Sequence, residues 1–357
     1  MNTYAEGPRS LLVVRLGAMG DAIHTMHAVS ALRAANPQLK IGWVIEQRWA
    51  ELLCAMDAMR SGERTPRRPL VDLVHTVNTK KWRRAIFASE TRNDIMGAFR
   101  EIRQQQYDLA ADFQGAMKSA LAARFAGAKR VVGMDHPRER PARILYSRRV
   151  PMRGAHVIEQ YYSLAEAIAG TPLPHLAPEF PHDETAESWL TAKLGDAQGR
   201  IAILNPGAGW AAKQWPAERY GEVACAFAQD GAQPIINFGP GEADLAEAVQ
   251  SASNGMAIPL SCSIGELIAL CRRARIFVGG DTGPLHLAAA LGVPTVAIFG
   301  PTDPARNGPY GTKSVVLRSP ASRTSLSHTS LPDSGLMQIT SGEVIRAARR
   351  LLEDSHG

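Results

Sequence analysis

The sequence predicts an α/β protein of two domains, each built on a parallel sheet, and three observations support this prediction. The chain has 357 residues, which is long for one domain and suits two. Short apolar runs alternate with longer stretches of helical periodicity, and this order of elements produces parallel sheets with right-handed crossovers. Residues 171–183 contain four prolines, which exclude a helix or a central strand and indicate a semi-rigid linker.

The first half contains four apolar runs that we expect to be buried strands, at 11–16, 41–46, 107–113 and 130–134. Helices are expected at 21–35 and 92–105. In the first helix Ala22, Met26 and Val29 fall on one face of a 3.6-residue repeat, and Pro37 marks its end.

The second half repeats this order. The expected strands are 201–205, 234–238, 275–280 and 295–299, and the expected helices are 216–229, 242–251, 263–273 and 284–291. A capping box, Thr340-x-x-Glu343, precedes a last helix. The predicted domains are residues 1–175 and 183–335, followed by a helix at 341–354.

Composition indicates a globular protein with anionic partners. The chain is 45% hydrophobic and 21% charged, with a net charge of +6. This charge suits nucleotides, nucleic acid, phosphorylated glycans or an acidic membrane face. The four cysteines form no CxxC pair, so we expect reduced thiols in the cytosol. The first residues lack the apolar segment of a signal peptide and no run is long enough to span a bilayer, so membrane contact is expected to be peripheral.

The loop after the first strand is "RLGAMGDAIHT". Gly17 and Gly20 allow a tight turn and a close approach to a ligand. Asp21 begins the following helix, where it caps the first turn at about 1 kcal/mol or has a catalytic role. The spacing is not G-x-G-x-x-G, so a dinucleotide fingerprint is not supported.

Three loops of the second half have features of a phosphate site. In "GGDTGPLHL", Asp281 or Thr282 caps a helix, Gly283 leaves backbone N–H groups open to a diphosphate, and His286 is either a buried histidine or a ligand contact. Lys213 is the one cation of "NPGAGWAAKQWP" and is either a phosphate contact or a solvated lysine. Glu242 in "FGPGEADL" either accepts from ribose hydroxyls or caps a helix.

Several catalytic signatures are missing from the sequence, namely D-x-D, GxxxxGK[ST], HExxH and GxSxG. A reaction on a nucleotide diphosphate without a metal or other cofactor fits the residues that remain.

Two basic clusters lie in the first half: "KKWRR" at 80–84 and the segment 129–153, whose net charge is +6. A solvated face is one interpretation. The predominance of arginine in the second cluster favours recognition of phosphate or carboxylate. Nucleic acid is less favoured, because aromatic residues are only 6% and no RRM, KH or helix-turn-helix signature occurs.

The motifs "RLGAMGDAIHT", "KKWRRAIF", "YDLAADFQGAMKSA", "RVVGMD", "KQWP" and "VGGDTGPLHLAAALGVPTVAIFGPTDPARNGPYG" together resemble glycosyltransferase family 9, the ADP-heptose heptosyltransferases. The resemblance implies a GT-B fold, in which two Rossmann-like domains face a cleft and the last helix often returns to the first domain. It implies inverting, metal-independent transfer of L-glycero-D-manno-heptose from ADP to a Kdo sugar of the lipopolysaccharide inner core on lipid A. The expected location is the cytoplasm, peripherally on the cytoplasmic face of the inner membrane.

The resemblance also implies residue roles. Asp21 matches the general base, and Lys213 matches the lysine that stabilises the leaving diphosphate. The implied donor contacts are Gly17, Ala18, Gly20, Glu242, Cys262, Asp281, Thr282, Gly283 and His286. Cys262 stands where relatives can place a methionine against adenine, and "GAMGD" replaces a frequent Ser-Ser-Met-Gly-Asp. The implied acceptor contacts are Lys80, Lys81, Arg83, Arg84, Arg138, Arg140 and Arg143, which would grip phosphates and Kdo carboxylates or an anionic membrane.

Three alternatives stay open. One is a family member that uses another acceptor, such as a first heptose or a capsular or protein glycan. Another is a basic scaffold that binds nucleic acid and has no catalytic activity, which the combination of Asp21, Lys213 and Asp281 disfavours. A nicotinamide dehydrogenase lacks its glycine fingerprint here. The segment 322–339 receives no role.

Overall fold

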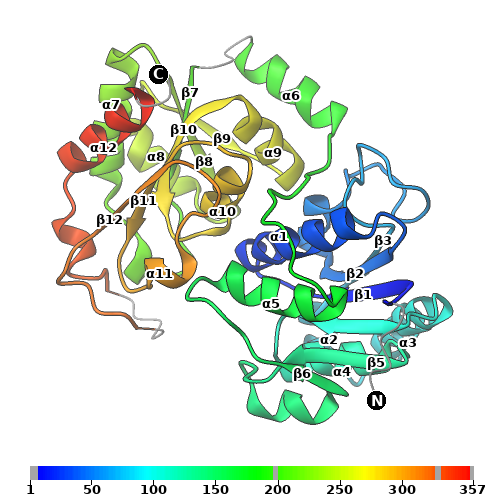
Figure 1. The fold of residues 1–357 in the computed structure, drawn as a ribbon. Coiled ribbons are helices and arrows are strands. Elements are labelled where there is room, and N and C mark those ends of the chain that lie inside the picture. The colour runs from blue at the N-terminus through cyan, green and yellow to red at the C-terminus, as the bar shows by residue number, and fades with distance from the viewer. Residues whose placement is uncertain (1–6, 196–199, 326–330, 354–357) are drawn as a thin grey trace. The chain divides into compact units, whose positions relative to one another are not determined.

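The computed structural model describes residues 7–195, 200–325 and 331–353. The chain divides into two compact units, unit 1 ending at His182 and unit 2 beginning at Asp183. Figure 1 shows one sheet in each unit, with helices on both of its faces. None of the helices in the described residues has both the length and the apolar character that a bilayer span requires.

Unit 1 contains a sheet of six parallel strands in the order β3-β2-β1-β4-β5-β6. The strands are β1 (Ser10–Val14), β2 (Lys40–Glu46), β3 (Leu73–Val77), β4 (Leu109–Asp112), β5 (Arg130–Met134) and β6 (Arg148–Val150). The helices are α1 (Met19–Ala35), α2 (Thr79–Arg84), α3 (Ser89–Gln104), α4 (Met117–Phe125) and α5 (Val157–Ala169).

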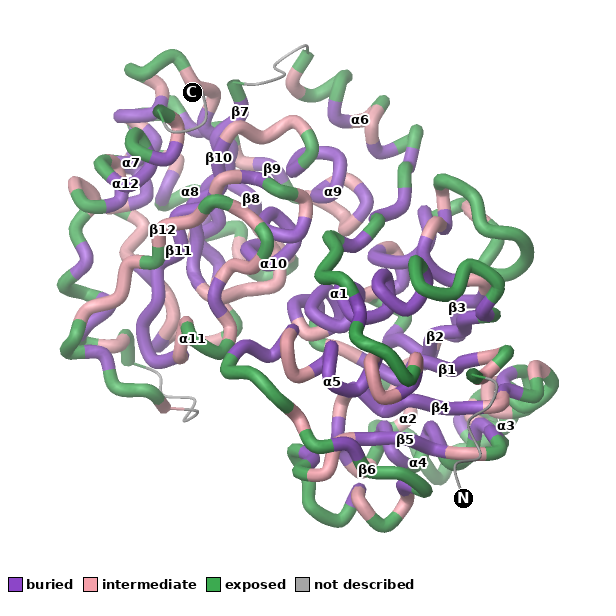
Figure 2. Tube along the Cα trace, in the orientation of Figure 1, coloured by how far each residue is buried: buried purple, intermediate pink, exposed green. Residues whose placement is uncertain are grey.

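Burial explains why the central strands are continuous apolar runs. Both faces of the sheet are covered, so successive side chains of β1, from Leu11 to Val14, are all buried (Figure 2). Between Met19 and Arg33 every residue of α1 except Asp21 is buried, and α5 packs against this helix. The acidic residue of the first turn is therefore the one position of this stretch that reaches solvent.

Unit 2 repeats the architecture in the order β12-β11-β10-β7-β8-β9, again all parallel. Its strands are β7 (Ile201–Asn205), β8 (Gln233–Phe238), β9 (Ile258–Ser261), β10 (Ala274–Gly280), β11 (Thr295–Phe299) and β12 (Ser314–Arg318). Its helices are α6 (Glu184–Leu194), α7 (Ala217–Gln229), α8 (Ala243–Ala252), α9 (Ile264–Arg273), α10 (Gly283–Ala290), α11 (Pro304–Asn307) and α12 (Ser341–Glu353). Counted along the chain, both sheets have the Rossmann order 3-2-1-4-5-6.

The proline-rich segment connects the two units, as expected, and also packs on unit 1. The Leu176 N–H donates to the Tyr162 hydroxyl at 2.8 Å, and His27 donates to the Leu176 carbonyl at 3.0 Å. The His175 ring stacks on Tyr162 at 4.1 Å, and Phe180 is buried. These contacts with α1 and α5 extend the first unit beyond residue 175.

The last helix belongs to unit 2, so the expectation that it joins the first domain is wrong. Its apolar stripe consists of Val344, Ala347, Ala348 and Leu351, which are buried in the core of unit 2. The helix packs on α7, β11 and β12. Within the segment 322–339, Leu336 and Ile339 join the same core, while 326–330 lie outside the described residues.

Candidate active site

In each unit the candidate residues follow the strands at which the strand order reverses. Strands are added on one side of β1 and then on the other from β4, and the same reversal occurs between β7 and β10. In open α/β sheets, ligands bind beyond the carboxyl ends of such strands. Asp21 lies in the first turn of the helix that follows β1, Lys213 lies between β7 and α7, and Asp281 lies between β10 and α10.

The Asp21 carboxylate caps its helix and is also open to solvent. Its Oδ2 accepts from the Ala18 N–H at 3.3 Å and pairs with Arg15 Nη2 at 2.5 Å. The Asp21 side chain is 42% exposed, whereas the Arg15 side chain is buried. The cap and the catalytic interpretation of Asp21 are therefore compatible.

The buried Arg15 is the partner of this carboxylate. It is not among the site residues that the sequence predicted. Its Nη1 donates to the Phe113 carbonyl at 2.6 Å and to the Tyr161 hydroxyl at 2.9 Å. Burial lowers the pKa of Arg15, but Tyr161 and Asp21 raise it, and the net shift is upward. A signal was present, because a cation that ends the apolar run "LLVV" is costly to bury without a partner.

The loop between Arg15 and Asp21 requires its first glycine. Gly17 has a φ of +152°, and a Cβ at this position would lie 2.7 Å from Trp49 Nε1. The backbone conformation at Gly17 therefore favours glycine, and the ring of Trp49 limits the space for a side chain.

A cavity of about 1410 Å³ in unit 1 opens beside Asp21. Of the seven predicted acceptor cations, only three line it: Lys80, Arg83 and Arg138. The other four, Lys81, Arg84, Arg140 and Arg143, are not among the lining residues, and two of them form ion pairs elsewhere, Lys81 with Asp94 and Arg143 with Asp135. The lining also contains four cations that were not predicted: Arg48, Arg100, Arg103 and Lys118.

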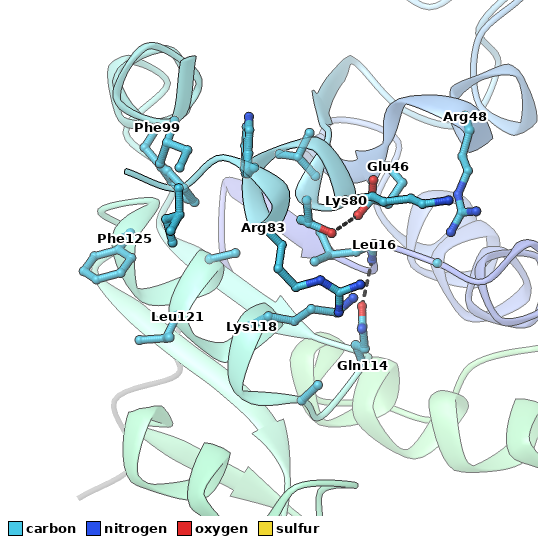
Figure 3. A pocket seen from close by; sticks show the side chains of 18 of the residues that line it. Leu16, Glu46, Arg48, Lys80, Arg83, Phe99, Gln114, Lys118, Leu121 and Phe125 are labelled. Carbon is cyan, nitrogen blue, oxygen red and sulfur yellow. Dashed lines mark hydrogen bonds between the residues drawn. The ribbon is translucent and has the colours of Figure 1, made fainter. Parts of the chain in front are cut away.

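Figure 3 shows the polar end of this cavity, where Leu16, Glu46, Arg48, Lys80 and Gln114 lie near one another. Thr79 donates to Glu46 Oε1, and the Leu16 N–H donates to Gln114 Oε1 at 3.0 Å. The first bond connects the end of β2 with the start of α2, and the second connects the segments that follow β1 and β4. The cations therefore surround a fixed edge of the sheet.

In unit 2, Lys213, Asp281 and His286 form one buried group. Lys213 Nζ lies 2.5 Å from Asp281 Oδ2 and 3.3 Å from the Asp281 carbonyl oxygen, and His286 Nε2 lies 3.2 Å from Asp281 Oδ1. The Lys213 ammonium also lies 4.2 Å from the centre of the Trp210 ring. Burial raises the pKa of Asp281, but the hydrogen bond and charge of His286 and of Lys213 outweigh it and hold the pKa well below its usual range.

The N-terminus of α10 follows directly and is suited to an anion. Thr282 is the N-cap residue, but its hydroxyl donates to the Gly280 carbonyl, and the described structure gives this helix end no side-chain cap. Gly283 opens the helix and Pro284 occupies its first turn. Backbone N–H groups at such an end attract phosphate.

Glu242 and Cys262 follow the two strands on the other side of β7. Glu242 Oε2 accepts from the Gly239 N–H at 2.8 Å. The Glu242 carboxylate packs against Gly207, where a Cβ would clash with its oxygens. Burial raises the pKa of the Cys262 thiol to about 12, so it remains neutral. A neutral thiol suits the apolar contact expected for it.

The predicted donor contacts are divided between the units. Gly17 and Ala18 line the cavity of unit 1, and Gly20 lies in the first turn of α1 outside that lining. The remaining donor residues all belong to unit 2. In the described parts of both units, no group of three or more His, Cys, Asp or Glu side chains is arranged to hold a metal ion.

Comparison with known proteins gives concordant results. Residues 95–331 match the model of glycosyltransferase family 9 (heptosyltransferase). Lipopolysaccharide heptosyltransferase 1 of Pseudomonas aeruginosa is 30% identical over 316 residues, covering 87% of this chain and 83% of that protein. The corresponding Escherichia coli K12 protein is 29% identical over 315 residues, 87% of this chain and 93% of that protein. The structure of E. coli heptosyltransferase WaaC with ADP-2-deoxy-2-fluoro heptose is 25% identical, with a TM-score of 0.75 over 97% of this chain and 99% of that one.

Proposed function

The chain belongs to glycosyltransferase family 9, the heptosyltransferases, and from this premise we propose that it transfers heptose from ADP-L-glycero-D-manno-heptose to a Kdo sugar of the lipopolysaccharide inner core on lipid A. It has the GT-B-type architecture of two Rossmann-like domains. The proposed donor is supported by the ADP-heptose analogue named with the E. coli structure, and the names of the relatives support lipopolysaccharide as the class of acceptor. We place the enzyme peripherally on the cytoplasmic face of the inner membrane.

Unit 1 supplies the general base of the proposed reaction. Asp21 accepts the proton of the acceptor hydroxyl as that oxygen attacks the anomeric carbon from the side opposite the diphosphate, so the configuration inverts. Proton transfer of this kind contributes about 10²–10⁴-fold to the rate. Arg15, at 2.5 Å, fixes the position of the carboxylate.

The bond between the anomeric carbon and the diphosphate breaks with its electron pair on ADP, and unit 2 stabilises the charge that develops. Asp281 accepts from Lys213 through a carboxylate and a carbonyl oxygen, which leaves one of the three ammonium N–H donors for phosphate. The N-terminus of α10 adds backbone donors. Because these groups supply fixed positive charge at the leaving group, we propose that the reaction needs no metal ion.

The observation that carries this proposal is the position of Asp21. A partly exposed carboxylate, anchored by a buried arginine, lines a cavity whose other charged groups are mainly cations. A structural cap would need neither the arginine nor the cavity.

A transfer assay tests the proposal. ADP-L-glycero-D-manno-heptose is mixed with de-acylated Kdo₂-lipid A in EDTA, and ADP release is followed for wild type and Asp21→Asn. We expect turnover by the wild type and a loss of about 10²-fold or more in the variant. Turnover that occurs only without EDTA would refute the metal-independent mechanism. An Asp21→Asn variant as active as the wild type would refute the role of Asp21.

Binding measurements separate the alternatives when the transfer assay shows no turnover. Binding of ADP in calorimetry without transfer would move the acceptor to another glycan. Binding to mixed DNA or RNA without affinity for ADP would favour the scaffold.

A further inference from the structure

The cavity of unit 1 has two ends of opposite chemistry. Figure 3 shows Phe99, Leu121 and Phe125 gathered on one side, away from Glu46 and Arg48 on the other. The apolar side is lined by side chains from α2, α3, α4 and the residues after α2: Trp82, Ile86, Ile95, Met96, Phe99, Leu121, Ala122 and Phe125. Only the opposite end has been given a role in the proposed reaction.

The helices at the apolar end have apolar faces that are only partly covered. On α3, Ile95, Phe99 and Ile102 follow one another at helical spacing, but only Ile102 is buried. On α4, Leu121 and Phe125 lie one turn apart and are both exposed, Phe125 by 49%. The rings of Phe99 and Phe125 meet edge to face at 6.1 Å, so the two helices form one continuous apolar wall.

The whole cavity is larger than a sugar phosphate needs. The cavity of about 1410 Å³ exceeds the roughly 300–1,000 Å³ of most small-molecule sites. Arg103 also lines the cavity, and its Nε donates to the Phe125 carbonyl at 2.7 Å. The aromatic and aliphatic side chains themselves offer no partners for sugar hydroxyls, which would lose their hydrogen bonds to water against them. The occupant of this end must therefore be apolar.

The occupant must also carry negative charge. Arg83 and Lys118 lie between the two ends in Figure 3, and Arg100 and Arg103 of α3 line the same cavity. Cations beside an apolar wall are complementary to an amphiphile with an anionic head. A phosphorylated glycolipid has this combination within one molecule.

We propose that the apolar end of the cavity binds an acyl chain of the acceptor glycolipid, while the cations hold its phosphates and carboxylates near Asp21. The inference rests on the proposed function in taking a glycolipid as the acceptor. It adds that the enzyme recognises the lipid part of the acceptor in a built site. Ile86, which lines this end, is 51% exposed, so the apolar end is open to solvent.

The first test compares acceptors with and without acyl chains. A buried methylene group favours binding by about fourfold, so even a partly buried chain should lower the acceptor KM by about tenfold or more. The KM values for acylated and de-acylated Kdo₂-lipid A are measured for wild type and for Leu121→Gln and Phe125→Gln. The KM for the de-acylated acceptor divided by the KM for the acylated acceptor should fall towards one in these variants.

Ile144→Gln is the matched control, because Ile144 is 84% exposed in the same unit and does not line the cavity. It should keep the wild-type ratio. A ratio near one in the wild type, or one that Leu121→Gln and Phe125→Gln leave unchanged, overturns the inference. An equal effect of all three variants also overturns it, because it would indicate non-specific contact with a lipid surface.

The second test does not depend on turnover. Trp82 lines the cavity, so a brominated fatty acid bound there should quench its fluorescence. The quenching should be lost in Trp82→Phe, be weakened in Phe125→Gln and persist in Ile144→Gln. Absence of transfer to either acceptor would refute the proposed function, whereas absence of Trp82 quenching would refute the acyl site.

Discussion

Replacing Asp281 by asparagine should destabilise unit 2 by about 3–5 kcal/mol at neutral pH. The side chains of Lys213 and Asp281 are only 10% and 8% exposed, and that of His286 is also buried. Removal of one partner from a buried ion pair leaves the other charge without compensation, which costs about this much. Asparagine keeps the shape of the side chain, so the loss would report the charge.

The effect should depend on pH. The pKa of Asp281 lies well below its usual range because His286 and Lys213 outweigh the effect of burial. A group whose pKa is lowered by folding stabilises the folded state above its unfolded pKa, about 3.9 for aspartate, and loses this contribution as the pH falls towards the folded pKa. The difference between wild type and variant should therefore be constant from pH 7 to about pH 5 and shrink below it.

Urea unfolding followed by intrinsic fluorescence measures this difference. With a slope of about 1–3 kcal/mol per molar urea, a loss of about 3–5 kcal/mol lowers the midpoint of unit 2 by about 1–5 M. Asp230→Asn is the control, because Asp230 pairs with Arg349 on the surface of the same unit and should shift the midpoint far less. If the two variants shift the midpoint equally, the argument from burial is wrong.

Four further predictions follow from individual contacts. Lys213→Met should weaken ADP binding in calorimetry and lower kcat by about 10²–10³-fold, as for loss of a donor to the leaving group; unchanged ADP affinity would contradict its role. Gly17→Ala should lower activity, because the new Cβ would lie 2.7 Å from Trp49 Nε1 at a φ that only glycine adopts readily; wild-type kinetics would show that the loop yields. Arg83→Glu should raise the acceptor KM more than Arg84→Glu, since only Arg83 lines the cavity; equal effects would mean that overall charge, and not the cavity, binds the acceptor. Tyr146→Phe should cost about 1.5–3 kcal/mol in thermal unfolding, because the Tyr146 hydroxyl donates at 2.7 Å to the buried Asp112 carboxylate; an unchanged melting temperature would contradict this.

The strands that the sequence predicted and those that it missed differ in their place in the sheets. The predicted strands correspond to β1, β2, β4 and β5 in unit 1 and to β7, β8, β10 and β11 in unit 2. The strands without a prediction are β3, β6, β9 and β12, which are the four edges of the two sheets. An edge strand pairs on one side only and tolerates charges and proline, as in "RRV" and "IPLS". Continuous apolar runs reveal central strands and not edges.

The candidate site was predictable where one loop carries several of its residues. Asp281, Thr282, Gly283 and His286 share a loop and a helix start, so their proximity follows from their spacing. Arg48, Arg100 and Lys118 come from three separate elements, and only the fold brings them to one cavity. Spacing along the chain does not contain that information.

In the basic cluster 80–84, helical spacing decides which cations line the cavity, and the sequence did not predict this helix. These residues form α2, in which positions three apart share a face. Lys80 and Arg83 are such a pair and line the cavity, whereas Lys81 and Arg84 form the next pair and do not. Without a predicted helix at 79–84, the four cations cannot be told apart from the sequence.

The position of α12 has a consequence for biosynthesis. Since this helix completes the core of unit 2, the described chain passes from one unit to the other once, at His182 and Asp183. Every element of unit 1 therefore emerges from the ribosome before the elements of unit 2, and domains generally fold in that order. A single junction in the gene then separates the two folding units, so that exchange of one unit between relatives needs one recombination point instead of two.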